Sequence, residues 1–242
     1  MNRSIVARCV MAVLLCLFLI GCATDPVTGR PTLARSESWE IDQGARYHQE
    51  ILKQYQVYED PELQAYVNRI GQKLAAKSHR SHLNFTFTLL DSPEVNAFAL
   101  PGGTIVVTDE LIREFPDADV IAGILGHEIG HVVEDHGLHR LYRSLGAYAL
   151  IALLVGETGP MLEDILLEGN ALLSLSYSRA QESAADEFGL TLSHSAGFDP
   201  IGLKIFFERL GAGIGDDMQW MSTHPNHSNR VEAIELYIRG LE

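Results

Sequence analysis

Residues 122–136 read A-G-I-L-G-H-E-I-G-H-V-V-E-D-H and contain the pattern H-E-x-x-H at His127, Glu128 and His131. Residues four apart lie on the same face of an α-helix, so both imidazoles can point at one metal ion. The Glu128 carboxylate lies one step round the helix, where it can reach a water molecule at the metal without binding the metal itself. Because a pattern with three fixed residues also occurs by chance, it becomes decisive only with a third ligand.

The residues around this pattern favour a helix. Phe115-Pro116-Asp117 predicts a stop followed by an N-cap, and His136-Gly137 predicts the helix end, with the histidine near the negative end of the helix dipole. Apolar residues recur between them at helical spacing, at Val120, Ile121, Ile124, Leu125, Ile129 and Val132. This apolar face is expected to pack into a core while the two imidazoles face a cleft.

The remaining segments predict an α+β fold in one domain over residues 37–242. Hydrophobic residues make up 46% of the 242, enough for a sizeable core. Helices are predicted over residues 37–55, 61–77, 176–194, 200–210 and 228–241, and strands over residues 84–90 and 104–108. The apolar residues 146–155 are predicted to form a buried helix, with contact at a membrane surface as the alternative. The fold is therefore expected to be mainly helical, with a small sheet that roofs the cleft.

Residues 1–21 predict a signal peptide. Arg3 and Arg8 precede an apolar run over residues 10–20, which is short for a membrane span. The run ends in L-I-G-C, which resembles the bacterial lipobox and implies cleavage before Cys22 and lipidation of that residue; an uncleaved anchor helix is the alternative. Alanine rather than aspartate follows Cys22, which favours the periplasmic face of the outer membrane of a Gram-negative bacterium, with residues 22–36 as a lipidated tether.

Charge and cysteine content limit the partners. Removing Arg3 and Arg8 from the 18 basic residues leaves 16 against 32 acidic ones, a net charge of −16. Such a chain repels nucleic acid and anionic lipid, so we expect no nucleic-acid partner and membrane attachment through acyl chains. The three cysteines are Cys9, Cys16 and Cys22. All belong to the leader or its cleavage site, so the domain has no disulfide.

A third metal ligand is predicted on a later helix. Catalytic zinc needs three protein ligands and one open position. The extended pattern H-E-x-x-H-x-x-G-x-x-H fails here, because Glu134 stands at the glycine position and Gly137 at the last histidine. Glu182 and Asp186 are four apart, so Glu182 can bind the metal while Asp186 accepts the far N–H of a ligand histidine. An acidic, solvated helix face is the alternative.

Four motifs in order resemble the HtpX-like gluzincin metallopeptidases, a group that includes Oma-type, BepA-type and LoiP-type proteases. They are N-A-F-A-L-P-G-G at residues 96–103, H-E-x-x-H, S-R-x-x-E-x-x-A-D-x-x-G at residues 178–189, and S-T-H-P at residues 222–225. The resemblance covers roughly residues 61–236. The lipobox and the chain length are most similar to the LoiP-type lipoproteins, since neither the paired transmembrane helices of HtpX nor the tetratricopeptide repeats of BepA are found.

The resemblance implies a zincin fold and one zinc ion held by His127, His131 and Glu182. Glu128 would be the general base toward a zinc-activated water molecule, and Asp186 would orient a ligand histidine. Asn96 and Ala97 would belong to the edge strand that pairs with the backbone of a substrate.

Two residues remain open. His224 is either a stabiliser of the oxyanion or a fourth zinc ligand that holds the enzyme idle, unless it is an ordinary surface histidine. Arg230 would steady the oxyanion or pair with Asp186 or Glu182.

The function implied is a zinc endopeptidase that hydrolyses unfolded or misassembled proteins of the cell envelope. The alternative is a chaperone-like lipoprotein that assists outer-membrane protein assembly and holds a structural or latent zinc. Candidate partners are unfolded polypeptides, the membrane through the lipid anchor, and the outer-membrane assembly machinery. A chaperone whose zinc is only structural has no need of Glu128, which favours the enzyme.

Overall fold

The computed structural model describes residues 22–24, 31–33, 36–140, 176–212, 220–225 and 229–241. It divides into two units, Met1–Trp39 and Glu40–Glu242. In the first unit, strand β1 (Cys22–Thr24) pairs with β2 (Pro31–Leu33) in antiparallel fashion, within the segment predicted as a tether. The predicted signal peptide and the apolar residues 146–155 lie outside the described residues.

The second unit contains a four-stranded mixed sheet, which includes strands at both predicted positions and two further short strands. Its strands are β3 (Gln56–Val57), β4 (Thr86–Asp91), β5 (Ala97–Ala99) and β6 (Thr104–Thr108), in the order β3-β4-β6-β5. Strands β4 and β6 run parallel, and the other two pairs are antiparallel. Strand β5 therefore forms an outer edge of the sheet.

Two helices precede β4, one on each side of β3 in the chain, and they match the predicted ones within two residues at each end. They are α2 (Glu37–Gln54) and α3 (Pro61–Ala75). The Asp60 carboxylate caps α3 by accepting hydrogen bonds from the backbone amides of Glu62 and Leu63. Gln64 on α3 donates from its amide to the Phe87 carbonyl and accepts from the Leu89 amide, so α3 completes the hydrogen bonds of β4.

The H-E-x-x-H residues lie on α5 (Ala118–Val133), which follows the short helix α4 (Asp109–Glu114). The predicted cap is confirmed, since the Asp117 carboxylate accepts from two amides of the first turn. The predicted end is wrong. Helix α5 ends at Val133, Asp135 adopts a left-handed φ of 53°, and residues 136–140 are helical again. Non-glycine residues seldom adopt this conformation, so the sequence pattern does not indicate the break.

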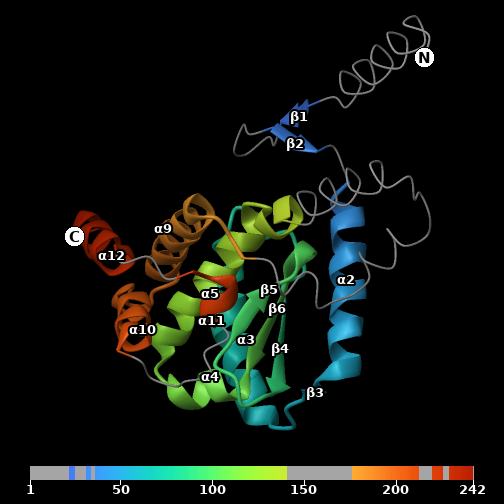
Figure 1. Ribbon diagram of the computed structural model, residues 1–242, viewed down its shortest axis with the longest axis horizontal. Coiled ribbons are helices and arrows are strands. Elements are labelled where there is room, and N and C mark those ends of the chain that lie inside the picture. The colour runs from blue at the N-terminus through green and yellow to red at the C-terminus, as the bar shows by residue number, and fades with distance from the viewer. Residues whose placement is uncertain are drawn as a thin grey trace, which may run out of the picture. The chain divides into compact units, whose positions relative to one another are not determined.

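Four more helices follow in the described part of the chain. They are α9 (Arg179–Ser195), α10 (Ile201–Gly211), α11 (Trp220–Thr223) and α12 (Arg230–Leu241). Helix α9 begins three residues later than predicted, because Ser178 and Gln181 form a capping box. Figure 1 shows α9, α10 and α12 on one side of α5 and the sheet on the other.

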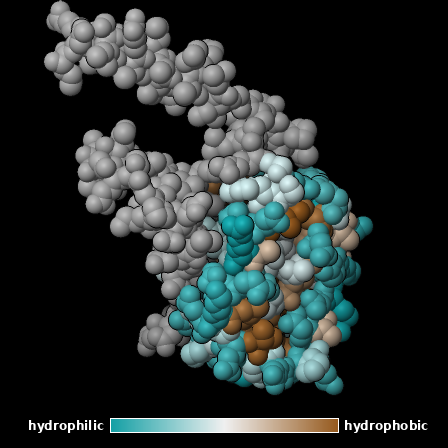
Figure 2. Space-filling model, turned by 90° about the vertical axis from the view of Figure 1, so that its right-hand side faces the viewer, coloured by the Kyte–Doolittle hydropathy of each residue, from teal (hydrophilic) through white to brown (hydrophobic). Residues whose placement is uncertain are grey.

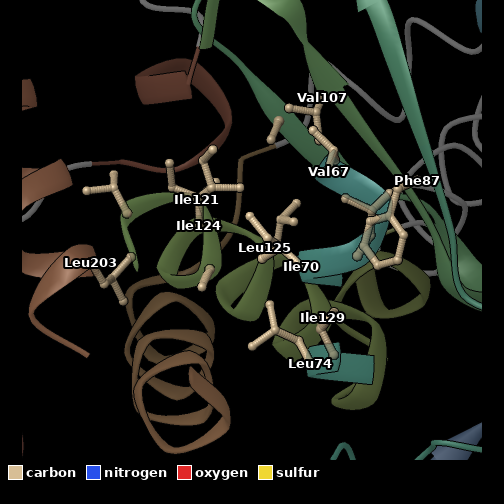
Figure 3. Close-up of a cluster of buried hydrophobic side chains, with 14 of the residues drawn as sticks. Val67, Ile70, Leu74, Phe87, Val107, Ile121, Ile124, Leu125, Ile129 and Leu203 are labelled. Carbon is tan, nitrogen blue, oxygen red and sulfur yellow. The ribbon is translucent and has the colours of Figure 1, made fainter. Parts of the chain in front are cut away.

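Helix α5 runs through the middle of the hydrophobic core, and the predicted apolar face is buried. Figure 3 shows its side chains between those of α3, the sheet and α10. Ile121, Ile124, Leu125 and Ile129 are all fully buried. Burying such a side chain contributes roughly 1.5–3 kcal/mol, so this core holds the metal-site helix firmly in place.

Helices α5 and α9 cross at very close range through glycines. A Cβ atom added to Gly189 on α9 would lie 2.7 Å from the His127 backbone nitrogen, and one added to Gly126 on α5 would lie 3.0 Å from the Gly189 carbonyl oxygen. No larger residue fits at Gly189 without separating the helices. This contact brings the first turn of α9, with Glu182, next to the two histidines of α5.

The described residues on the face shown in Figure 2 are mainly hydrophilic. On the face shown in Figure 2, hydrophobic residues form small separate patches among hydrophilic ones. Among the described helices, none combines the length and apolar character needed to cross a membrane. The fold is thus a mainly helical domain with a small mixed sheet, as the α+β prediction has it.

Candidate metal centre

Four side chains converge inside the second unit. His127 and His131 come from α5, Glu182 from α9, and His224 from the residue after α11. One ligand atom of each lies within 4.8 Å of those of the other three, and all four side chains are buried. The predicted convergence of Glu182 with the two imidazoles is confirmed, and the alternative of a solvated acidic face is wrong, because Glu182 is 0% exposed.

The distances suit one tetrahedral ion. The Nε2 atoms of His127 and His131 are 3.0 Å apart, and the Glu182 oxygens lie 3.7 Å and 3.6 Å from them. Zinc–nitrogen bonds of about 2.0–2.1 Å place neighbouring tetrahedral ligands about 3.3 Å apart. Glu182 Oε1 makes no hydrogen bond within the described residues. A buried carboxylate oxygen left open in this way fits a metal ligand.

His127 is oriented by Asp186, as the sequence predicts. Its Nδ1 lies 2.9 Å from Asp186 Oδ1. Because His127 Nε2 faces the cluster, Nδ1 carries the proton and donates it. Arg230 is also buried and lies next to both carboxylates of α9. It donates to Asp186 Oδ2 at 2.8 Å and to Glu182 Oε2 at 2.7 Å. Of the two predicted roles for Arg230, the structure shows the ion pairs with these carboxylates.

His131 has partners that the sequence analysis misses. Its Nδ1 lies 2.9 Å from Nδ1 of His136. The Tyr177 ring stacks on the imidazole, with ring centroids 3.7 Å apart and planes 13° from parallel. The Arg140 guanidinium, itself buried, lies 3.8 Å from the Tyr177 centroid on that ring. The sequence does offer a signal for His136, a histidine five residues after the second ligand, but the pattern His136-Gly137 by itself indicates only a helix end.

Glu128 is fully buried beside the ligands, and its electrostatics are unusual. Neither carboxylate oxygen completes a hydrogen bond of normal geometry within the described residues. Burial is the main cause that raises the pKa of Glu128 well above its usual value, and the nearby Glu182 carboxylate adds to it. The charge of Arg140 and the Ala99 backbone amide on β5 partly offset this increase. A carboxyl with a raised pKa holds a proton readily, as a proton-transferring group must.

His224 is held like the two ligand histidines of α5. Its Nδ1 lies 2.9 Å from the Thr223 hydroxyl oxygen, and its ring stacks on Trp220, with centroids 4.2 Å apart. Its Nε2 points into the cluster, makes no hydrogen bond within the described residues, and lies 3.4 Å from Glu128 Oε1. The interpretation as a surface histidine is wrong, because the side chain is 0% exposed.

The outer edge of strand β5 carries the backbone groups of two alanines, whose side chains are buried. The Thr108 amide donates to the Asn96 carbonyl and the Leu100 amide to the Thr104 carbonyl, so these backbone groups face β6. In an antiparallel pair the intervening residues turn their backbone groups outward, which are those of Ala97 and Ala99. Asn96 lies at the start of this edge with its backbone engaged by β6, and Ala99 is a candidate that the sequence analysis does not name.

Burial leaves the three imidazoles of the cluster neutral and ready to bind a metal ion, but it opposes ionisation of Glu182. Burial lowers the pKa of His127, and it lowers those of His131 and His224 well below the usual value, so all three imidazoles are neutral. Burial raises the pKa of Glu182 to about 8, although Arg230 opposes it. Burial also acts to raise the pKa of Asp186, but the hydrogen bond with His127 and the charge of Arg230 outweigh it and lower that pKa.

Most of the chain matches a known protein family. The sequence pattern of Peptidase family M48 matches residues 61–238. The chain belongs to Peptidase family M48. This confirms the predicted metallopeptidase family at the level of the family as a whole, and His127, His131 and Glu182 form the buried metal site of this family M48 chain.

Several curated proteins are similar to this family M48 chain. It is 34% identical over 184 residues to mitochondrial metalloendopeptidase OMA1 of Arabidopsis thaliana, which covers 75% of the chain and 37% of that protein. It is 32% identical over 178 residues to OMA1 of Schizosaccharomyces pombe, covering 72% and 52%. Its identity to the beta-barrel assembly-enhancing protease of Escherichia coli K12 is 28% over 181 residues, covering 71% and 37%. The matched region thus spans 37% to 52% of these relatives.

Proposed function

We propose that the chain is a zinc endopeptidase of the bacterial cell envelope that hydrolyses unfolded or misassembled envelope proteins. The observation that carries the proposal is the position of Glu128. Its carboxylate is buried next to His127, His131 and Glu182, yet neither oxygen makes a hydrogen bond of normal geometry within the described residues. A structural metal site has no use for a second carboxyl group, left open beside the ligands.

Zinc is the proposed ion because two imidazoles, a carboxylate and a buried pocket match its preferred ligands. When bound, it lowers the pKa of a coordinated water molecule to about 7 and polarises a carbonyl group. Glu128 accepts the proton of the attacking water and delivers it to the leaving amine. Asp186 keeps the proton of His127 on Nδ1, so that Nε2 stays free for the ion.

Substrate binding is assigned to the outer edge of β5, next to Glu128. The outward backbone groups of Ala97 and Ala99 can pair with an extended peptide, which gives affinity without demands on its side chains. Asn96 lies at the start of the same edge and would contact the end of the bound peptide. Recognition through the backbone requires a substrate that can be extended, and this favours unfolded chains over folded ones.

For His224 the geometry favours the role of a fourth ligand in a resting state. Its Nε2 lies in the ligand cluster, and its Nδ1 has a partner as do those of His127 and His131. A fourth protein ligand would occupy the position that water needs. His224 must then leave the ion before hydrolysis, and the role of an oxyanion stabiliser is the competing one.

The proposed location is the periplasmic face of the outer membrane, with a lipid on Cys22, as in LoiP-type lipoproteins. Two observations support it: the lipobox-like end of the leader, and the similarity to a protease of Escherichia coli named for beta-barrel assembly. Unfolded envelope proteins and the outer-membrane assembly machinery are the corresponding partners. Labelling of cells with a radioactive fatty acid tests the anchor, since replacing Cys22 by Ala should abolish incorporation.

Degradation of casein by the purified protein tests the activity. We expect degradation that stops when a chelator removes the metal and returns when zinc is added. A protein that holds zinc, prevents aggregation of unfolded outer-membrane proteins and leaves casein intact would instead be the chaperone-like lipoprotein. Elemental analysis of the same preparation identifies the ion.

A further inference from the structure

The two ligand histidines of α5 have different partners behind them. His127 donates from Nδ1 to a carboxylate, that of Asp186, which is ion-paired with Arg230. The corresponding partner of His131 is an imidazole, that of His136. The Nδ1 atoms of the two rings are 2.9 Å apart. The His136 side chain is 3% exposed, so solvent water does not compete with it for the hydrogen bond with His131 Nδ1.

The position of His131 decides the direction of this hydrogen bond. Its Nε2 faces the ligand cluster and must keep its lone pair for the ion. The proton of the neutral ring is therefore on Nδ1, which donates to His136. A nitrogen accepts only when it carries no proton, so His136 must be neutral with its own proton on Nε2.

The chain is built to place His136 at this point. Helix α5 stops at Val133, and the left-handed Asp135 turns the backbone so that the next residue faces back toward His131. Arg80 holds that turn by donating to Asp135 Oδ1 at 2.8 Å and to the Val132 carbonyl at 3.2 Å.

Arg80 is in turn fixed by Glu40 on α2, which is 5% exposed and accepts from both of its terminal nitrogens, at 3.1 Å and 2.7 Å. Oxygen Oε1 of Glu40 also accepts from the Gly102 amide at 2.9 Å, in the turn that follows β5. Arg80 is 12% exposed and joins α2 to the end of α5, so it keeps the Asp135 turn in one conformation.

We propose that His136 is a positioning residue for the metal ligand His131, and that the Arg80–Asp135 ion pair aims it. His136 fixes the tautomer and the ring orientation of His131 by accepting its Nδ1 proton, while the Tyr177 ring supports the face of the same imidazole. The inference requires the metal site, but not the proposed peptidase activity or its substrates.

Zinc affinity of the full chain, measured by competition with a chromophoric chelator, tests the role. Removing the partner of a ligand histidine typically costs 10–100-fold in metal affinity, and we expect that loss for His136→Ala. His136→Asn should keep most of the affinity, because Asn Oδ1 takes the place of Nδ1 and accepts the same proton. The control is His194→Ala, which removes an exposed histidine at the end of α9 and should bind zinc like the wild type.

Wild-type zinc affinity in His136→Ala would overturn the proposal, and so would an Asn variant that binds as weakly as the Ala variant. A second measurement needs no variant. Nitrogen-15 NMR of the imidazoles in the zinc-loaded wild type should show His136 neutral, with its proton on Nε2. A proton on its Nδ1, or on both nitrogens, would contradict the assignment even if every variant failed to fold.

Discussion

Gly189 on α9 lies directly against the backbone of His127 on α5, so that a Cβ atom at Gly189 would be 2.7 Å from the His127 nitrogen. The helix that supplies the third ligand thus touches the helix that supplies the first two, at the first ligand itself. The metal site depends on this contact, because Glu182 reaches the histidines only when the two helices are this close.

Gly189→Ala should therefore destabilise the fold. Overpacking of a tight contact costs about 1–3 kcal/mol, and the neighbouring atoms here are backbone and cannot rotate away. Urea unfolding measures the free energy. Gly211→Ala is the matched control, since a Cβ atom there meets no neighbour within 4 Å among the described residues, and alanine favours a helix. Equal stability of the two variants would show that the contact is looser than described.

Glu182 should make the metal-free protein less stable as the pH rises. Burial raises its pKa to about 8 in the folded state from the usual 4.5, so the folded state binds the proton more tightly. Its stabilising contribution is full below pH 4.5 and is lost as the pH rises through about 8. The Glu182→Gln variant cannot bind or release this proton. The buried histidines affect the free energy of unfolding of both proteins alike, so the difference between the two proteins reports on Glu182.

The measurement is the difference in unfolding free energy between wild type and Glu182→Gln, in excess chelator, from pH 5 to pH 9. The wild type should lose stability relative to the variant over this range. A difference that stays constant, or grows with pH, would mean that the carboxyl is already ionised at low pH in the folded state.

Replacing His224 by Ala should increase the rate of casein hydrolysis and weaken zinc binding. A fourth ligand that blocks the water position is removed, while His127, His131 and Glu182 remain. Initial rates at saturating zinc make the comparison. If His224 instead stabilises the oxyanion, its loss should lower kcat by about 10²–10³-fold, as for the removal of one such donor.

The helices and the main ligands follow from local patterns in the sequence. Asp117 caps α5 as its position before the apolar run predicts, and the spacing of Glu182 and Asp186 places both on the face of α9 that meets the histidines. Such features involve residues within one or two helical turns of each other, where sequence spacing determines geometry.

What the sequence does not reveal depends on contacts between distant segments. The end of α5 is set by Asp135, whose left-handed conformation is held by Arg80 from far earlier in the chain. The stack of Tyr177 on His131 joins residues 46 positions apart. The strand order also depends on contacts between distant segments. Alternating polar and apolar residues predict β4 and β6, but they do not predict that these strands pair in parallel or that β5 lies at the edge of the sheet.

The rate of casein hydrolysis by Glu128→Gln, measured with one zinc ion bound per chain, tests the central claim most directly. Glutamine preserves the shape of the side chain but cannot take up a proton, so zinc should stay bound while hydrolysis falls by at least about 10²-fold, the usual contribution of a general base. Hydrolysis at the wild-type rate in the zinc-loaded variant would contradict the role of Glu128 and the function built on it.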